Sequence, residues 1–335
     1  IGMPELQIMN ADTETNVEVA RARAEKLIAD GAQLLVGAFD SGQSTAIAQV
    51  AEQKGIPFVI NIAAAPPITE QGYKFVFRNF PTAIDLTNNG LQLLGDLFRA
   101  TNVAPRTAVF MHVNDTFGQS MSKAIGGILP RLTQLPFKIT ETISYDPAAK
   151  DLSVEVSKAK AAKADFLLLV CRLNDAIILR REIVKQRWNM MGMVSPGSPG
   201  IYEDQFLKAL GKLSDYCISN NPWYNPKTNM TAAVVKQMAK QFPKEKIFTH
   251  GANVAYTFES ILIAAEKNGT SRFYAARLRE NASFGKIFHD SDDEIVKRTA
   301  GSAQFSAEQK GCTASAEVGG ATGGALKRLV DKRLD

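Results

Sequence analysis

The feature that most constrains this sequence is a regular alternation between short apolar runs and segments with apolar residues at helical spacing. The apolar runs are four to eight residues long, a length typical of buried strands, and each is bounded by turn-forming residues. The predicted strands are residues 33–39, 56–62, 108–113, 138–145 and 166–171, and the predicted helices are residues 17–30, 41–55, 84–100, 152–162 and 175–188. Such alternation predicts βαβ units and therefore an α/β fold with doubly wound parallel sheets.

The first predicted helix carries start and stop signals. Thr15 and Glu18 have the spacing of a capping box, and Gly31 follows the last apolar position of the helix. We therefore expect Thr15 to cap this helix at its N-terminus.

The length of 335 residues allows two domains of ordinary size, and 45% hydrophobic residues can fill two cores. We predict two lobes joined by a hinge. The first comprises residues 1–104 with 246–285, and the second comprises residues 105–245 with 286–335.

Composition and motifs argue against several functional classes. The net charge is +5 without a run of like charges, so no nucleic-acid partner is expected. No segment approaches the about 18 apolar residues of a membrane span. The three cysteines, Cys171, Cys217 and Cys312, are too widely spaced for a metal site or a disulfide framework, and the first two are expected in the core.

The usual catalytic motifs are also missing. The sequence has no GxGxxG, GxxxxGK[ST], GxSxG or HExxH, and its histidines are only His112, His250 and His289. We expect no enzyme, no cofactor and no metal, although an enzyme stays open as a competing hypothesis. His112 ends a predicted buried strand and is expected in the core or in a pocket wall.

In open α/β sheets, ligands bind beyond the carboxyl ends of the strands. In the first lobe, Ser41 and Ser44 begin a helix after a strand, so they are expected either to cradle an anion or merely to cap the helix. Phe39 precedes them, and the small-residue segment Ile62, Ala63 and Ala64 follows the next strand, where it either admits a ligand or permits tight packing.

In the second lobe, the candidate residues at strand ends are Phe117, Arg172, Gly197 and Ser198. Arg172 directly follows an apolar strand, where a charge needs a partner. It is expected either to bind a ligand carboxylate through two hydrogen bonds or to pair with Asp175.

The chain resembles the branched-chain amino acid (leucine/isoleucine/valine) binding proteins of the periplasm. The matching segments, in the family's order, are Ala24-Glu-Lys-Leu-Ile, Leu35-Val-Gly-Ala-Phe, Ser41-x-x-Ser-Thr-Ala, Gly55-Ile-Pro-Phe-Val, Pro66-x-Ile-Thr-x-x-Gly-Tyr, Phe77-Arg, Asn114-Asp-Thr-Phe-Gly and Ala164-Asp-Phe-Leu-Leu. The resemblance implies a type I periplasmic binding protein fold. It further implies a monomeric receptor, with its signal peptide removed, that closes on its ligand and delivers it to the membrane permease of an ABC importer.

Residue by residue, the family's carboxylate-binding serine falls on Ser41, its threonine on Ala64 and its tyrosine on Phe117. Its ammonium-binding glutamate falls near Gly197, which has no acidic side chain. A buried ammonium without an acceptor is costly. We therefore expect a carboxylate ligand without an α-amino group, and Phe39 and Phe117 favour an aromatic acid such as a hydroxybenzoate or a cinnamate.

Alternatives stay open at this point. The ligand could be a branched-chain or other amino acid, and the protein could be a ligand sensor of the same fold. The family's first strand and helix have no counterpart before Ile1, and the sequence after about residue 290 does not match.

Overall fold

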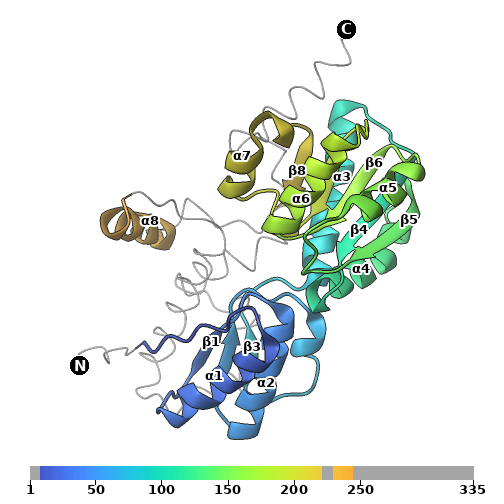
Figure 1. Ribbon diagram of the computed structural model, residues 1–335. Coiled ribbons are helices and arrows are strands. Elements are labelled where there is room, and N and C mark those ends of the chain that lie inside the picture. The colour runs from blue at the N-terminus through green and yellow to red at the C-terminus, as the bar shows by residue number, and fades with distance from the viewer. Residues whose placement is uncertain (1–7, 221–228, 244–335) are drawn as a thin grey trace. The chain divides into compact units, whose positions relative to one another are not determined.

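A computed structural model describes residues 8–220 and 229–243 (Figure 1). The chain divides into two compact units. Among the described residues, the first unit holds 8–82 and 229–243, and the second holds 83–220. Within this part of the chain, no helix is both long enough and apolar enough to cross a membrane.

The first unit is built on a three-stranded parallel sheet in the order β1-β2-β3. Its elements are α1 (Val17–Ala29), β1 (Leu35–Gly37), α2 (Ser41–Lys54), β2 (Phe58–Ile60), the 3-10 turn η1 (Pro66–Ile68), β3 (Val76–Arg78) and α8 (Asn229–Gln241). Helices α1 and α2 pack together, and their apolar faces cover β1 and β2 in one core. Gly55 ends α2 in the left-handed conformation, which only glycine adopts without strain.

The cap of α1 differs from the prediction. Asn16, rather than Thr15, is the N-cap residue, because its side chain accepts hydrogen bonds from the backbone N–H groups of Glu18 and Val19 at 2.9 and 3.1 Å. Thr15 instead lies in the turn before the helix at a φ of 53°.

The second unit is built on a five-stranded parallel sheet in the order β5-β4-β6-β7-β8. Its elements are α3 (Ala83–Thr101), β4 (Thr107–Val113), α4 (Thr116–Ile128), η2 (Leu129–Arg131), β5 (Lys138–Tyr145), α5 (Ser153–Ala161), β6 (Phe166–Val170), α6 (Leu173–Lys185), β7 (Met193–Pro196), α7 (Asp204–Leu210), η3 (Gly211–Ser214) and β8 (Cys217–Asn220). Every residue of β6 is buried, as its continuous apolar sequence predicts.

The predicted α/β class with parallel sheets in two lobes is confirmed. The order of the second sheet also defines a topological switch point, because the chain leaves β4 towards β5 on one side and then crosses back to β6 on the other. Right-handed crossovers in these two directions place α4 and α5 on opposite faces of the sheet. In sheets of this class, the loops that follow the strands on either side of such a point diverge, and ligands bind beyond the carboxyl ends of these strands.

The division of the chain differs from the predicted lobes at two helices. Helix α3 packs on α4 and against β7, so the division falls between Thr82 and Ala83 rather than after residue 104. Helix α8 groups with the first unit, whereas the predicted second lobe extended to residue 245. The assignments of residues 246–285 and 286–335 lie outside the described residues.

Candidate functional site

In the first unit, the loop between β1 and α2 is organised by Asp40. Its carboxylate accepts the N–H groups of Gly42 and Gln43 at 2.8 and 3.1 Å, so Asp40 is the N-cap of α2. Neither Ser41 nor Ser44 is the N-cap, so the helix-capping role left open for them is wrong. The position at which we expected a ligand carboxylate to meet backbone N–H groups holds the carboxylate of Asp40.

The two serine hydroxyls join α2 to the loops that follow β1 and β2. Ser41 Oγ accepts the N–H of Ala65 at 3.3 Å, and Ser44 Oγ contacts both the N–H and the C=O of Ala38, at 3.2 and 3.3 Å. Both side chains are fully buried. Their role in ligand binding stays a prediction.

The other candidates in this unit differ sharply in exposure. Ile62, Ala63 and Ala64 are buried, whereas Phe39 is 43% exposed at the end of β1. An exposed phenyl ring at the carboxyl end of a strand is an apolar contact surface in the region where such sheets bind ligands.

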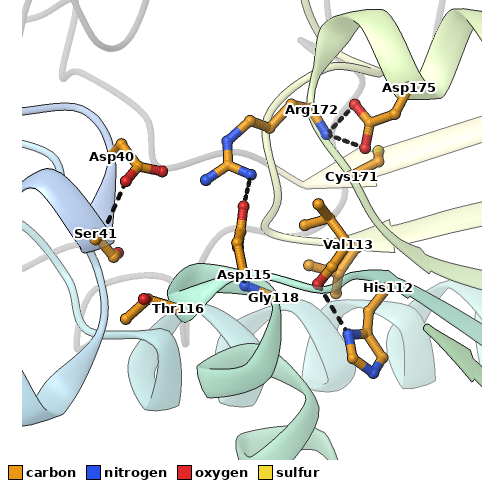
Figure 2. Close-up of polar contacts among 12 residues, drawn as sticks. Asp40, Ser41, His112, Val113, Asp115, Thr116, Gly118, Cys171, Arg172 and Asp175 are labelled. Carbon is orange, nitrogen blue, oxygen red and sulfur yellow. Dashed lines mark hydrogen bonds and ion pairs between the residues drawn. The ribbon is translucent and has the colours of Figure 1, made fainter. Parts of the chain in front are cut away.

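In the second unit, an ion pair lies across the switch point. Arg172, at the end of β6, donates from Nη1 to Oδ2 of Asp115, at the end of β4 (Figure 2). The side chains of Arg172 and Asp115 keep 24% and 19% exposure. The alternative left open for Arg172, an ion pair with Asp175, is wrong, because the Asp175 carboxylate accepts the backbone N–H of Arg172 and the guanidinium pairs with Asp115.

Two further contacts fix the geometry of this pair. Asp115 is the N-cap of α4, with Oδ1 accepting the N–H of Gly118 at 2.8 Å. The guanidinium of Arg172 lies over the ring of Phe117, 5.4 Å from its centroid, in a cation–π contact. Phe117 is buried, and its ring supports the guanidinium of Arg172. The contact expected between this ring and an aromatic ligand stays a prediction.

Behind Arg172, a buried network holds its backbone. The carboxylate of Asp175 accepts the N–H of Arg172 at 2.9 and 3.1 Å and receives the hydroxyl of Tyr145 at 2.6 Å. The Tyr145 hydroxyl also lies 3.1 Å from the carbonyl of Val170. Burial is the main cause that raises the pKa of Asp175, and it raises the pKa of Tyr145 well above its usual value.

The turn after β7 packs directly against Cys171 and Arg172, which follow β6. Ser198 Oγ accepts the N–H of Cys171 at 3.1 Å and contacts Ser195 Oγ at 2.5 Å. Gly200 has a φ of +109°, and a Cβ there would lie 2.6 Å from the carbonyl of Arg172. The turn can approach Arg172 this closely only because residue 200 is glycine.

The backbone conformation at residue 197 favours glycine over an acidic residue. Its φ is +92°, and a Cβ at this position would lie 3.1 Å from Cβ of Leu86. An acidic side chain at residue 197 would therefore be strained as well as crowded, in keeping with the departure noted in the sequence.

Sequence reasoning did not select Asp115, Tyr145 or Gly200. Asp115 carried a signal, because Asp directly before the start of a helix is typical of an N-cap. Tyr145 and Gly200 carried none, since their roles arise from pairing between strands far apart in the sequence.

The remaining candidates are structural. His112 is buried, with Nδ1 3.0 Å from the carbonyl of Val113 and its ring stacked on Phe110 at 5.3 Å. Cys171 and Cys217 are buried free thiols, as expected, and Cys312 lies outside the described residues. Residues 8–220 and 229–243 contain no cluster of three or more His, Cys, Asp or Glu side chains that could hold a metal ion.

Comparison with known proteins assigns a family. Residues 2–302 match the model of the family described as periplasmic binding protein. The leucine-, isoleucine-, valine-, threonine- and alanine-binding protein of Pseudomonas aeruginosa is 25% identical over 156 residues, which cover 47% of this chain and 40% of that relative. The Leu/Ile/Val-binding protein of Escherichia coli is 24% identical over 165 residues and is covered to 42%, so the match spans less than half the length of these curated relatives.

Solved structures of this fold are also similar. A leucine-binding protein from Thermotoga maritima superposes with a TM-score of 0.66 at 17% identity, covering 78% of this chain and 71% of that one. A solute-binding protein of an ABC transporter from Rhodopseudomonas palustris, solved in complex with 3,4-dihydroxybenzoic acid, gives a TM-score of 0.65 at 16% identity, covering 78% and 70%. At these identities the similarity establishes the fold.

Proposed function

This chain belongs to the periplasmic binding protein family, and on that premise we propose that it is the solute-binding receptor of an ABC importer. In this role it captures a small carboxylate outside the cytoplasmic membrane and delivers it to a membrane permease. Capture occurs by hinge closure, in which the ligand shifts an equilibrium between open and closed forms, without a covalent step.

The observation that carries the proposal is the placement of Arg172. It is a partly exposed guanidinium at the carboxyl ends of the strands, beside the switch point of the sheet. Its guanidinium contacts the carboxylate of Asp115 and the ring of Phe117, and its backbone N–H donates to the carboxylate of Asp175. A cation held in place before binding loses little entropy when it takes up an anion, and a guanidinium matches the geometry of a carboxylate.

For the ligand itself, we propose an aromatic acid of the hydroxybenzoate or cinnamate kind. The absence of an acidic side chain at Gly197 and the exposed ring of Phe39 support this choice. The Rhodopseudomonas palustris neighbour bound to 3,4-dihydroxybenzoic acid offers a precedent on the same fold.

The second candidate ligand is an amino acid. The names of the curated relatives favour it, and so does Asp115, an acidic side chain adjacent to Arg172 that could accept an ammonium group. A ligand sensor of the same fold would use the same site, and the effect of the ligand on transport would distinguish it from an importer subunit.

Substitution of Arg172 tests the proposal. Purified protein is titrated by calorimetry with 4-hydroxybenzoate, cinnamate, leucine, isoleucine and valine. We expect at least one of them to bind, and Arg172→Met to weaken its binding by about 100-fold or more, because the ligand carboxylate loses its charged partner. Arg181→Met, in the helix α6 that follows Arg172, is the matched control, because Arg181 is exposed and donates to the carbonyl of Ala209. Unchanged binding in Arg172→Met would mean that Arg172 does not bind the ligand carboxylate.

A further inference from the structure

We propose that Phe117 is a positioning residue: its buried ring holds the guanidinium of Arg172 in the orientation that receives the ligand carboxylate, and it raises affinity through Arg172 instead of contacting the ligand. Phe117 then contributes equally to the affinity for every carboxylate and does not select for an aromatic ring. This role rests on the proposed function, because it requires Arg172 to bind the ligand carboxylate. It differs from the ligand contact that the sequence predicts for Phe117.

The first observation is the difference in exposure between the two side chains. Phe117 is only 7% exposed, whereas the side chain of Arg172 is 24% exposed. The Cζ atom of Arg172 lies over the ring of Phe117, 5.4 Å from its centroid. A ligand at the carboxyl end of β6 therefore meets the guanidinium more readily than the ring, which already carries a cation over its face.

The second observation is that two groups hold the guanidinium from different directions. The ring of Phe117 contacts its face, whereas Oδ2 of Asp115 accepts a hydrogen bond from Nη1 of Arg172 at its edge (Figure 2). The N–H groups of a guanidinium lie in its plane, so a ring against the face does not compete with an acceptor at the edge. Together the two contacts fix both the position and the plane of the group.

The third observation is that the backbone beneath the ring is itself held in place. Phe117 lies in the first turn of α4, directly before Gly118, where a Cβ would lie 1.8 Å from the carbonyl oxygen of Val113. One turn later on the same face, Met121 is fully buried, and its Sδ lies 3.7 Å from Oγ1 of Thr87 in α3. Contacts with β4 and with α3 thus set the orientation of the ring before a ligand arrives.

A guanidinium ordered in advance favours binding. An arginine side chain that becomes ordered only on binding loses rotamer freedom, and that loss weakens affinity. A ring that orders the side chain beforehand removes part of this loss. For a partly exposed arginine, a cation–π contact corresponds to about fivefold to tenfold in an equilibrium constant.

Two replacements of the ring test this role. Phe117→Leu removes the ring and keeps an apolar side chain. Replacement of Phe117 with pentafluorophenylalanine keeps the shape and the packing but reverses the charge distribution of the ring, so the cation is no longer attracted to its face. This second variant decides the question if Phe117→Leu affects folding.

Phe137→Leu is the matched control. Phe137 is also buried, but its ring packs on Phe98 and Phe166 at the amino ends of β5 and β6, whereas Arg172 follows the carboxyl end of β6. A loss of affinity that came only from a weakened core would therefore appear in this variant as well.

Calorimetric titrations with 4-hydroxybenzoate, cinnamate and leucine give the dissociation constants of each variant, alone and combined with Arg172→Met. Both replacements of Phe117 should weaken the binding of every carboxylate that the original protein binds by about fivefold to tenfold. In the Arg172→Met background the same replacements should change affinity by less than about twofold, because no guanidinium remains to be held. Phe137→Leu should bind like the original protein.

A ring that contacts the ligand directly would give other results. The loss would then persist in the Arg172→Met background, and the pentafluorophenylalanine variant would bind the electron-rich ring of 4-hydroxybenzoate more tightly. Either result, or unchanged affinity in both variants of Phe117, would overturn the inference and leave the receptor proposal intact. If Arg172→Met bound as tightly as the original protein, or if the original protein bound no carboxylate, the proposed role of Arg172 would fall and this inference with it.

Discussion

At Gly118, the first turn of α4 passes so close to the end of β4 that there is no room for a side chain. A Cβ at this position would lie 1.8 Å from the carbonyl oxygen of Val113. The same residue donates its N–H to Asp115, so its position also fixes one end of the ion pair with Arg172.

Gly118→Ala should therefore destabilise the protein by at least about 3 kcal/mol, because the backbone of β4 or α4 must shift to accept the methyl group. Urea-induced unfolding measures the change. Gly126→Ala in the same helix is the control: a Cβ there meets nothing within 4 Å, so helix propensity should add about 0.5–1 kcal/mol of stability. Equal behaviour of the two variants would contradict the close approach at Gly118.

Individual residues were predicted least well from the sequence. The polar residues near the helix starts were identified, but the one that caps each helix was not. Asn16 rather than Thr15 caps α1, and Asp40 rather than a serine caps α2. Several polar residues stand within one turn of each helix start, and only the three-dimensional path of the chain decides which one reaches the free N–H groups.

At the scale of elements, Tyr145 connects three segments of the second unit. Its hydroxyl extends from the end of β5 to the carbonyl of Val170 in β6 and to Asp175 in α6. Burial raises the pKa of Asp175, whereas the hydrogen bond from Tyr145 lowers it, so the hydroxyl stabilises the ionised form.

Tyr145→Phe should cost about 2 kcal/mol at neutral pH, because a buried carboxylate loses its donor. The folded state then binds the Asp175 proton more tightly than before. A carboxyl group whose folded pKa is raised loses stability as pH rises from its unfolded pKa through its folded pKa, so the penalty should be larger at about pH 7 than at about pH 4.

Urea unfolding at both pH values tests this dependence. Tyr73→Phe is the control, because the Tyr73 hydroxyl makes no hydrogen bond in the part of the chain that the structure describes. A penalty for Tyr145→Phe that is independent of pH would mean that Asp175 does not sense the hydroxyl.

The elements themselves could be predicted from the sequence. The strand predicted at 138–145 coincides with β5, and the helix predicted at 84–100 lies within one residue of α3 at each end. Burial on both faces makes a central parallel strand such as β6 continuously apolar, and that pattern is local. The order of the strands, which creates the switch point between β4 and β6, depends on contacts between distant segments and was not predictable in detail.

At the scale of the whole molecule, the number of units was predictable from length and repeated βα patterns, whereas their boundary was not. Helix α3 has an apolar face that could pack in the core of either unit, and its contacts with α4 place it in the second unit. The candidate residues Phe39 and Arg172 lie just beyond the carboxyl ends of β1 and β6, where sheets of this class bind ligands, and their role in binding stays a prediction.

The central claim is that the native protein captures a carboxylate, and a change in melting temperature tests it most directly. Differential scanning calorimetry of the purified protein compares 4-hydroxybenzoate, cinnamate and leucine with their uncharged or cationic amides, 4-hydroxybenzamide, cinnamamide and leucinamide. A ligand that binds only the folded state adds about 2.7 kcal/mol of stability at 100 times its dissociation constant. We predict a raised melting temperature with at least one acid and none with its amide. An unchanged melting temperature with every acid, or an equal rise with acid and amide, would contradict the account.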